Sequence, residues 1–347
     1  MNPQCAPSPA SIRSAKDQAQ VQVFSTCPPS SSVPNRYVER VAEVARWSER
    51  AGCTGILVYT DNSIVDPWMV SQIVLQSTES LCPLVAVQPI YMHPYSVAKM
   101  VATAACLYGR KIFLNMVAGG FKRDLEALND TTPHDRRYDR LVEYTTIIQR
   151  LVENGPVKFD GEFYKINGVT LSPRVAPELR PEILVSGSSE AGLAAARAMG
   201  AMPVKYPKPP DEGNGPSPEE SYGVRVGVVA RRREEDAWPI AYDRFPEDRK
   251  GQMTRQLASK VSDSVWHKQL AEIGKQNGGK GPYWLHPFEN YQTNCPYLVG
   301  SYEQVAHELS LYIEHGCRTF ILDIPATEEE LDHIGHVFQI ACQRARL

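Results

Sequence analysis

The sequence predicts an α/β fold, a closed (β/α)8 TIM barrel with insertions at its C-terminal face. Short apolar runs alternate with amphipathic helical stretches from residue 21 to the end of the chain, and eight such runs can be counted. Apolar strands joined by helical crossovers indicate a parallel sheet. Eight of them in a chain of 347 residues favour a barrel. No GxGxxG motif follows the first strand, which weakens the alternative of an open dinucleotide-binding sheet.

The eight expected strands are short and rich in Val, Ile and Leu, as is typical of strands buried on both faces. A separate hairpin is expected over 157–167, because Asp160-Gly161 forms a turn pair between two short runs. The expected strands span 21–24, 55–58, 84–87, 112–116, 183–186, 202–206, 223–230 and 319–324.

The expected helices follow these strands, and Asp66-Pro67 supplies a cap and first turn for one of them. Two segments depart from the alternation. A Pro/Gly-rich connector at 207–218 replaces one helix, and 238–297 forms a lid-like insertion with Gly278-Gly279 as its hinge. The expected helices span 35–50, 66–77, 95–108, 137–153, a stretch after 189, 301–315 and a stretch from 327.

The composition is that of a soluble globular protein, with 42% hydrophobic and 22% charged residues. A net charge of −3 gives no electrostatic signature of nucleic acid or of an anionic membrane as partner. No apolar run approaches the length of a membrane span. We expect residues 1–20 to be a mobile tail and not a signal peptide, and 21–347 to form one domain.

The eight cysteines form no CxxC pair, so neither a zinc knuckle nor a redox pair is expected, and no cluster of metal ligands is found. Several of them lie in apolar contexts, which favours buried free thiols. Free thiols suit the reducing cytoplasm, where we expect the protein to reside.

A strand–turn–helix unit at 182–198 predicts an anion site. An apolar run ends at Gly187-Ser188-Ser189, and Glu190 opens an Ala-rich helix. The free backbone N–H groups at a helix start, with about half a positive charge from the aligned peptide dipoles, favour phosphate. The alternative is that Ser188 or Ser189 only caps the helix.

Polar residues follow other strands at the same end of the predicted barrel. Asn115 ends an otherwise apolar strand, where its amide can hold the hydrogen-bonding edge of a ring or be satisfied by nearby backbone. His93 lies in the loop after the third strand and is a candidate for proton transfer, or a structural residue. Arg137 and Tyr138 open the long helix and either face a phosphate or form a solvated helix start.

These residues carry a resemblance to a known family. Over residues 21–347 the chain resembles the luciferase-like flavin monooxygenases, in the branch of the alkanesulfonate and pyrimidine monooxygenases. Several stretches in the right order make the resemblance more specific than any one alone. They are Phe113–Gly119, Arg137-Tyr138-Asp139, Gly187-Ser188-Ser189, Tyr222–Arg225 and Leu298–Tyr302.

The resemblance implies a barrel that binds reduced FMN. In this family reduced flavin reacts with O2, and the resulting flavin (hydro)peroxide transfers one oxygen atom to a small organic substrate, here expected to be a specialised metabolite. The cofactor carries that chemistry, while the protein positions it and keeps water out. The flavin ring would lie beside Tyr59, Thr60, Asn115 and Asp124, and the phosphate would be held by Arg137, Tyr138, Gly187, Ser188 and Ser189.

The same resemblance implies the partners. The chain has no nicotinamide motif, so reduced flavin would come from a separate NAD(P)H:FMN reductase. A homodimer or homotetramer is usual in the family. Two other functions remain open, namely an F420-dependent oxidoreductase on the same fold and a non-catalytic flavin-binding barrel.

Four positions depart from the alkanesulfonate enzymes. Ile64 stands for a cysteine and Gly227 for a histidine, while Ile324 replaces a tyrosine and Tyr291 an arginine. A sulfonate substrate is therefore not expected, and the replacements favour a neutral or larger one. Arg225 remains, either to contact the peroxyflavin or an anionic substrate group, or to form a structural salt bridge.

Overall fold

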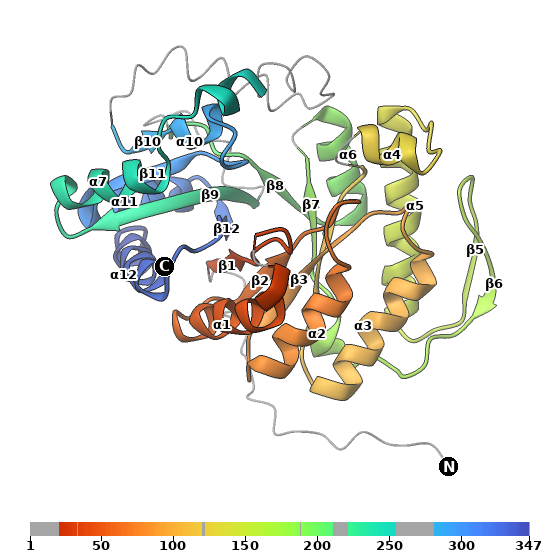
Figure 1. Cartoon of the computed structure of the whole chain (residues 1–347). Helices are drawn as coiled ribbons and strands as arrows, with labels where there is room; N and C mark the ends of the chain where they lie inside the picture. The colour runs from red at the N-terminus through yellow and green to blue at the C-terminus, as the bar shows by residue number, and fades with distance from the viewer. Residues whose placement is uncertain are drawn as a thin grey trace. The chain divides into compact units, whose positions relative to one another are not determined.

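The chain folds into the predicted (β/α)8 barrel, in which eight parallel strands alternate with helices (Figure 1). The structure, a computed structural model, describes residues 21–32, 34–119, 122–187, 189–210, 221–254 and 281–346. The predicted tail, Ser188, the Gly278-Gly279 hinge and most of the connector lie outside the described residues. The barrel strands are β1 (Gln22–Thr26), β2 (Gly55–Val58), β3 (Cys82–Val87), β4 (Phe113–Met116), β7 (Ile183–Ser186), β8 (Met202–Lys205), β9 (Tyr222–Arg231) and β12 (Cys317–Leu322).

The chain divides into two compact units. Unit 1 holds Pro29–Ala42 and Leu57–Met202, and unit 2 holds Glu43–Ile56, Pro203–Leu347 and the strand β1. The helix α1 (Tyr37–Arg50), after a short 3-10 turn η2 (Pro34–Arg36), runs from one unit into the other, as do β2 and β8.

In unit 1, β4 pairs in parallel with β3 and with β7. The four residues of β4 are all buried, as expected of a strand covered on both faces. The helices α3 and α5 pack side by side (Figure 1). The further elements of this unit are α2 (Pro67–Ser77), α3 (Pro94–Tyr108), α4 (Lys122–Ala127), α5 (His134–Val152), the antiparallel hairpin β5 (Val157–Asp160) and β6 (Lys165–Val169), η3 (Pro177–Leu179) and α6 (Glu190–Met199).

The core of unit 1 joins these strands to α3, α5 and α6. Leu114 and Val85 come from the strands, and Tyr144, Ile147 and Val101 from the helices, all with no exposed surface. Burying an aliphatic side chain of this kind stabilises the fold by roughly 1.5–3 kcal/mol. The 3.6-residue spacing of the apolar positions in 137–153 therefore predicts the observed helix, because only one of its faces meets the core.

In unit 2, β9 pairs in parallel with β8, β11 and β12, and β12 pairs with β1. Alternate residues of β9, such as Val224, Val226 and Val228, pack against α11 and α12. Arg225 and Gly227 therefore lie on the opposite face of the strand. The further elements are α7 (Glu234–Arg244), β10 (Tyr283–Trp284), α10 (His286–Glu289), β11 (Tyr297–Ser301), α11 (Tyr302–Glu314) and α12 (Glu328–Arg344).

The structure corrects the sequence-based expectation at several places. A short helix, α4, lies where a loop was expected, and α7 begins before the predicted insertion at 238–297. Two strands, β10 and β11, extend the sheet beside β9 and were not expected. Of the seven cysteines in the described ranges, six are free thiols as predicted, but Cys106 is disulfide-bonded.

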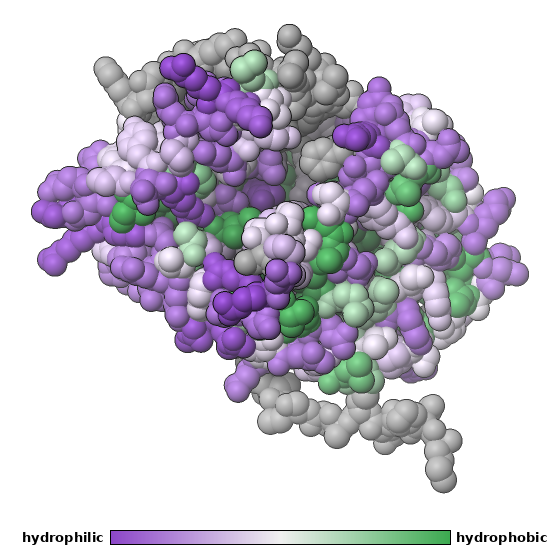
Figure 2. Space-filling model, in the orientation of Figure 1, coloured by the Kyte–Doolittle hydropathy of each residue, from purple (hydrophilic) through white to green (hydrophobic). Residues whose placement is uncertain are grey.

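Two surface properties of the described residues concern possible partners. None of their helices combines the length and apolarity needed to cross a bilayer. Apolar side chains do emerge on unit 1, and Figure 2 shows green areas in the region of α2 and α3. Met69 on α2 is 65% exposed and Leu107 on α3 is 67% exposed.

Candidate functional site

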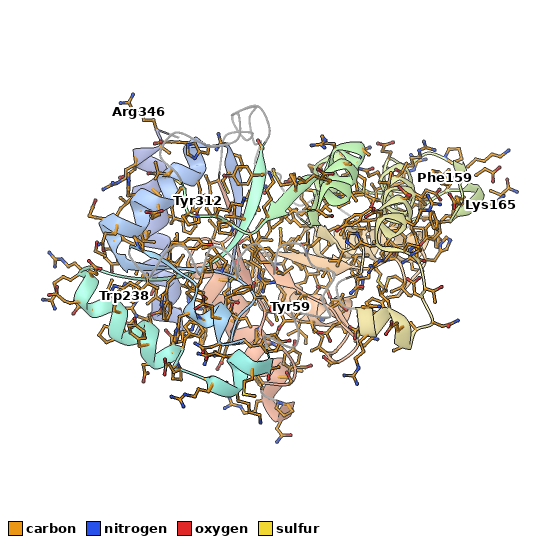
Figure 3. All side chains as sticks on the ribbon, turned by 90° about the horizontal axis from the view of Figure 1, so that it is seen from above. Tyr59, Phe159, Lys165, Trp238, Tyr312 and Arg346 are labelled. Carbon is orange, nitrogen blue, oxygen red and sulfur yellow. The ribbon has the colours of Figure 1, made fainter. Side chains whose placement is uncertain are left out.

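A cavity of about 240 Å³ opens in unit 1 where β2 and β3 end and α2 begins. Residues at the carboxyl ends of barrel strands are those that face the functional end of this fold. Tyr59, labelled in Figure 3, and Thr60 directly follow β2. The cavity is lined by Thr60, Asp61, Asn62, Ile64, Asp66, Pro67, Trp68, Ala86, Val87, Gln88, Tyr91 and Met92.

The start of α2 shapes one wall of this cavity. Asp66 is the N-cap, and its Oδ1 accepts hydrogen bonds from the backbone N–H of Trp68 at 2.9 Å and of Met69 at 3.1 Å. Pro67 occupies the first helical turn, where it sacrifices no hydrogen bond. The predicted cap is thus confirmed.

Asp124 lies beside the cavity, held by the loop that follows β2. Its Oδ2 accepts from the Asn62 backbone N–H at 3.3 Å, and its carbonyl accepts from Asn62 Nδ2 at 3.1 Å. Tyr91 Oη donates to Asn62 Oδ1 at 2.7 Å. Burial, with the negative charges of Asp124 and Asp61, raises the pKa of Tyr91 to about 12, so the phenol stays protonated.

Asn115 is joined to the end of β7. Its side chain is 5% exposed, and its Oδ1 accepts from Ser186 Oγ at 2.8 Å. A buried amide needs such a partner. The bond explains the polar residue in an apolar strand and sets the amide's orientation, with Oδ1 directed at Ser186.

Tyr138 meets the strand–turn–helix unit that the sequence singles out. A Cβ on Gly187 would stand 2.7 Å from Tyr138 Oη, and one on Gly192 would stand 3.2 Å from it. Only glycine at position 187 lets the phenol come so near the turn. Ser189 is the N-cap of α6, because its Oγ accepts from the Gly192 N–H at 3.1 Å. Capping by Ser189, one of the two interpretations of this residue, is therefore present.

Arg137 is buried beside Tyr138 on α5, with 6% of its surface exposed. Its guanidinium donates to the Gly119 carbonyl at 3.3 Å. Gly119 has φ +137°, and a Cβ there would stand 2.9 Å from Leu125. The glycine that follows β4 therefore allows the loop to pass close to the arginine.

His93 is the N-cap of α3. Its Nδ1 accepts from the Tyr95 backbone N–H at 3.2 Å, and its ring meets that of Tyr164 edge-on at 5.9 Å. The histidine is exposed and does not line the cavity. The structure thus shows a structural contact for this side chain, and its part in proton transfer stays a prediction.

Arg225 belongs to unit 2 and is described there by itself. Its guanidinium lies 3.9 Å from Asp323 Oδ1, with side chains 17% and 12% exposed. Asp323 Oδ2 accepts from Thr293 Oγ1 and from Tyr297 Oη, both at 2.7 Å. Burial raises the pKa of Tyr206, and the charge of Arg225 with a hydrogen bond opposes that rise. The alternative interpretation of Arg225, a structural salt bridge, is therefore supported by a long ion pair with Asp323.

Several residues of the site were not predicted. Asn62, Tyr91 and Ser186 connect the expected residues to one another, through bonds between segments that are far apart in the sequence. Ser186 could have been found, since it ends β7 as Asn115 nears the end of the neighbouring β4. Nothing in the spacing of Asn62 and Tyr91 indicates that they meet.

The polar groups of this site in unit 1 include hydrogen-bond donors of the kind that hold an anion. Among the described ranges, no three His, Cys, Asp or Glu side chains gather as metal ligands. By contrast, a phenol and a helix start come together at Gly187, while the Arg137 guanidinium bonds the Gly119 carbonyl. Donors of this kind suit an anion such as phosphate. The fold is thus a (β/α)8 barrel in which Gly187 follows β7 and lies close to Tyr138 of α5.

Comparison with known proteins gives the family. Residues 21–319 match the family described as luciferase-like monooxygenase, and the chain belongs to it. The protein is therefore an enzyme of the flavin-dependent monooxygenase type, as the sequence predicts.

Three similar proteins illustrate the range of the fold. The 4-(gamma-L-glutamylamino)butanoyl-[BtrI acyl-carrier protein] monooxygenase BtrO of Niallia circulans is 32% identical over 311 residues, covering 87% of this chain and 91% of that protein. The EDTA monooxygenase of Chelativorans sp. BNC1 superposes with a TM-score of 0.74 at 14% identity, covering 94% of each chain. An F420-dependent secondary alcohol dehydrogenase reaches a TM-score of 0.59 at 15% identity, covering 93% of this chain and 99% of that chain.

Proposed function

We propose that the protein is an FMNH2-dependent two-component monooxygenase that inserts one oxygen atom from O2 into a small organic substrate. Family membership supports the oxygenation. One observation of the structure carries the cofactor assignment, namely the approach of Tyr138 Oη to Gly187 at the start of α6. This approach puts a hydroxyl donor beside a helix N-terminus, the arrangement that favours a phosphate ester over a neutral group.

In this proposal one group of residues binds the phosphate of the cofactor and another group binds its ring. The phosphate is held through charge-assisted hydrogen bonds and helix-end amides, and the ring through a buried amide and the residues after β2. When bound, reduced flavin supplies the activation of O2 and the transfer of oxygen. The phosphate group comprises Arg137, Tyr138, Gly187, Ser188 and Ser189, and the ring group comprises Tyr59, Thr60, Asn115 and Asp124.

Two further residues are assigned catalytic parts. His93 accepts a backbone hydrogen bond at Nδ1, so in the neutral ring Nε2 carries the proton and is the atom that would exchange it. Arg225 would bind an anionic group of the substrate or the oxygenated cofactor, with Asp323 near enough to orient its guanidinium.

The partners follow from the chemistry. A separate NAD(P)H:FMN reductase would supply the reduced cofactor, and a cytoplasmic setting would suit that exchange. A homodimer or homotetramer is proposed from the family, and the exposed Met69 and Leu107 of unit 1 are apolar side chains that an interface would cover. Substrates to be screened are specialised metabolites, including acyl chains on a carrier protein, because the Niallia circulans relative acts on one.

The full-length protein would be titrated anaerobically with photoreduced FMN and then mixed with 18O2 and candidate substrates. Tight FMNH2 binding and one 18O atom in the product are expected. Tight binding of F420 with no binding of FMNH2 would instead favour hydride transfer. Flavin binding without any oxygen-dependent product would favour a binding protein.

The phosphate assignment has its own test. Tyr138→Phe removes the hydroxyl and keeps the ring, so FMNH2 affinity is expected to fall about five- to tenfold, the value of one hydrogen bond. Tyr108→Phe on α3 is the matched control and should leave affinity unchanged. Equal affinities for wild type and Tyr138→Phe would contradict the assignment.

A further inference from the structure

The cavity in unit 1 is acidic. Asp61 and Asp66 line it, and none of its twelve lining residues is Lys, Arg or His. We propose that this cavity binds the ammonium group of an amine-bearing substrate. The inference deepens the proposed function and rests on it, and it differs from the neutral substrate that the sequence favours.

The helix start in the cavity wall does not make it an anion site. The two backbone N–H groups that an anion would use, those of Trp68 and Met69, already donate to Asp66 Oδ1. An anionic ligand would have to displace this carboxylate and face its charge. Because the Asp66 carboxylate neutralises the positive helix end, the second carboxylate determines the sign of the net charge at the cavity wall.

Asp61 is that second carboxylate. Its Oδ1 accepts from the backbone N–H and from Oγ of Ser63, both at 2.6 Å, which fixes the side chain. Within the described ranges no hydrogen bond or ion pair engages its Oδ2. A fixed carboxylate with one oxygen available at the wall of a cavity is the feature that an ammonium group recognises.

Gln88 supplies an independent observation. Its side chain is 4% exposed and lines the cavity, yet among the residues that the structure describes it makes no hydrogen bond. Buried amides are normally paired, so this one lacks the partner that a ligand can supply. Its carbonyl oxygen would accept from the N–H of an ammonium group.

The remaining wall suits a cation attached to a carbon chain. Ile64 and Met92 offer apolar surface, and the face of Trp68 attracts cations through its quadrupole. Asp124 adds a third carboxylate next to the cavity, bound to Asn62 of the lining. Burial holds the pKa of Tyr91 above its ordinary value, and the negative charges of Asp124 and Asp61 raise it further.

The test compares the binding of three matched probes, hexylammonium, hexan-1-ol and hexanoate, to the full-length protein. Saturation-transfer NMR and calorimetry measure the affinity of each probe. Hexylammonium should bind most tightly and hexanoate least, and added salt should weaken only hexylammonium. Asp61→Asn keeps the turn to Ser63 and removes the charge, so hexylammonium affinity should fall about fivefold. Gln88→Leu should also weaken binding while leaving the melting temperature unchanged or higher, because the unpaired amide is gone.

Asp160→Asn is the control. It removes a carboxylate that is 77% exposed on the β5–β6 hairpin, which carries the Phe159 and Lys165 labelled in Figure 3, far from Tyr59. Hexylammonium affinity should not change there. Hexanoate binding as tightly as hexylammonium, or unchanged affinity in Asp61→Asn, would overturn the proposal.

Anaerobic FMNH2 titration of the same variants separates the two proposals. Unchanged FMNH2 affinity in Asp61→Asn supports a substrate role for this carboxylate. An equal loss of FMNH2 and hexylammonium affinity would assign Asp61 to the cofactor and overturn the inference. If wild-type protein binds hexylammonium but not FMNH2, the proposed function fails while the amine site stands.

Discussion

The ring of Tyr297 lies directly against the backbone of Gly227, where β9 pairs with β11. A Cβ on Gly227 would stand 2.2 Å from Tyr297 Cζ. The ring, which is 1% exposed, fills the space that a side chain at position 227 would need. Gly227, which stands for a histidine of the alkanesulfonate enzymes, therefore leaves room for an aromatic ring on the neighbouring strand. The hydroxyl of that residue, Tyr297, donates to Asp323.

Gly227→Ala is expected to lower the free energy of unfolding by about 1–3 kcal/mol, because the buried ring has to move to admit a methyl group. Urea denaturation would measure the change. Gly155→Ala is the control, since nothing lies within 4 Å of a Cβ there. In a Tyr297→Ala background the cost of Gly227→Ala should shrink, and additive effects of the two changes would contradict the packing argument.

Tyr297→Phe isolates the hydroxyl. Asp323 Oδ2 would keep only the bond from Thr293, so unfolding free energy should fall by about 1 kcal/mol. The ring still packs edge-on against Phe245 at 4.8 Å, so no cavity forms. Urea midpoints of Tyr297→Phe and wild type provide the comparison, and equal midpoints would show that the bond to Asp323 adds nothing to stability.

The barrel could be predicted because its signal is local. The runs at 55–58 and 183–186 are largely apolar, the second is bounded by Pro181 and Gly187, and they coincide with β2 and β7. The strand β10 has only two residues and is held by its partner β11, so its own sequence carries no periodicity. Likewise α4, six residues long, is too short to show a helical repeat.

In the site, too, single residues could be predicted from the sequence, whereas the contacts between them could not. Gly187 and Tyr138 were predicted one by one, and the structure brings them together. Their contact depends on the packing of α5 against α6, which no spacing in the sequence encodes. The bond between Asn62 and Asp124 joins residues 62 positions apart, and it was missed for that reason.

Ser189→Ala tests the capping bond that the structure shows. Removing the Oγ that accepts from Gly192 should lower unfolding free energy by about 1 kcal/mol. Thermal and urea denaturation would record this loss, and Ser189→Asp, which can also cap, should restore stability. Anaerobic titration would show whether FMNH2 affinity falls as well. Unchanged stability in Ser189→Ala would argue against the cap.

The pair of Asp130 and Arg140 predicts a pH dependence of stability. Arg140 donates to Asp130 Oδ2 at 2.6 Å, and the hydroxyl of Thr132 donates to Oδ1 at 2.6 Å. Burial alone would raise the pKa of Asp130, but these hydrogen bonds and the charge of Arg140 hold it below its ordinary value of 3.8. The carboxylate is therefore favoured in the folded state.

A carboxyl whose pKa is lowered on folding adds stability above its unfolded pKa and loses that contribution as pH falls through the folded one. At about pH 7, Asp130→Asn should lower unfolding free energy by roughly 2 kcal/mol, between the values for surface and buried pairs. The difference from wild type should shrink as pH falls below 3.8, the ordinary pKa of the group. Urea denaturation across this range measures it, with the exposed Asp160→Asn as control. A difference that stays constant with pH would show that ionisation of Asp130 is not its source.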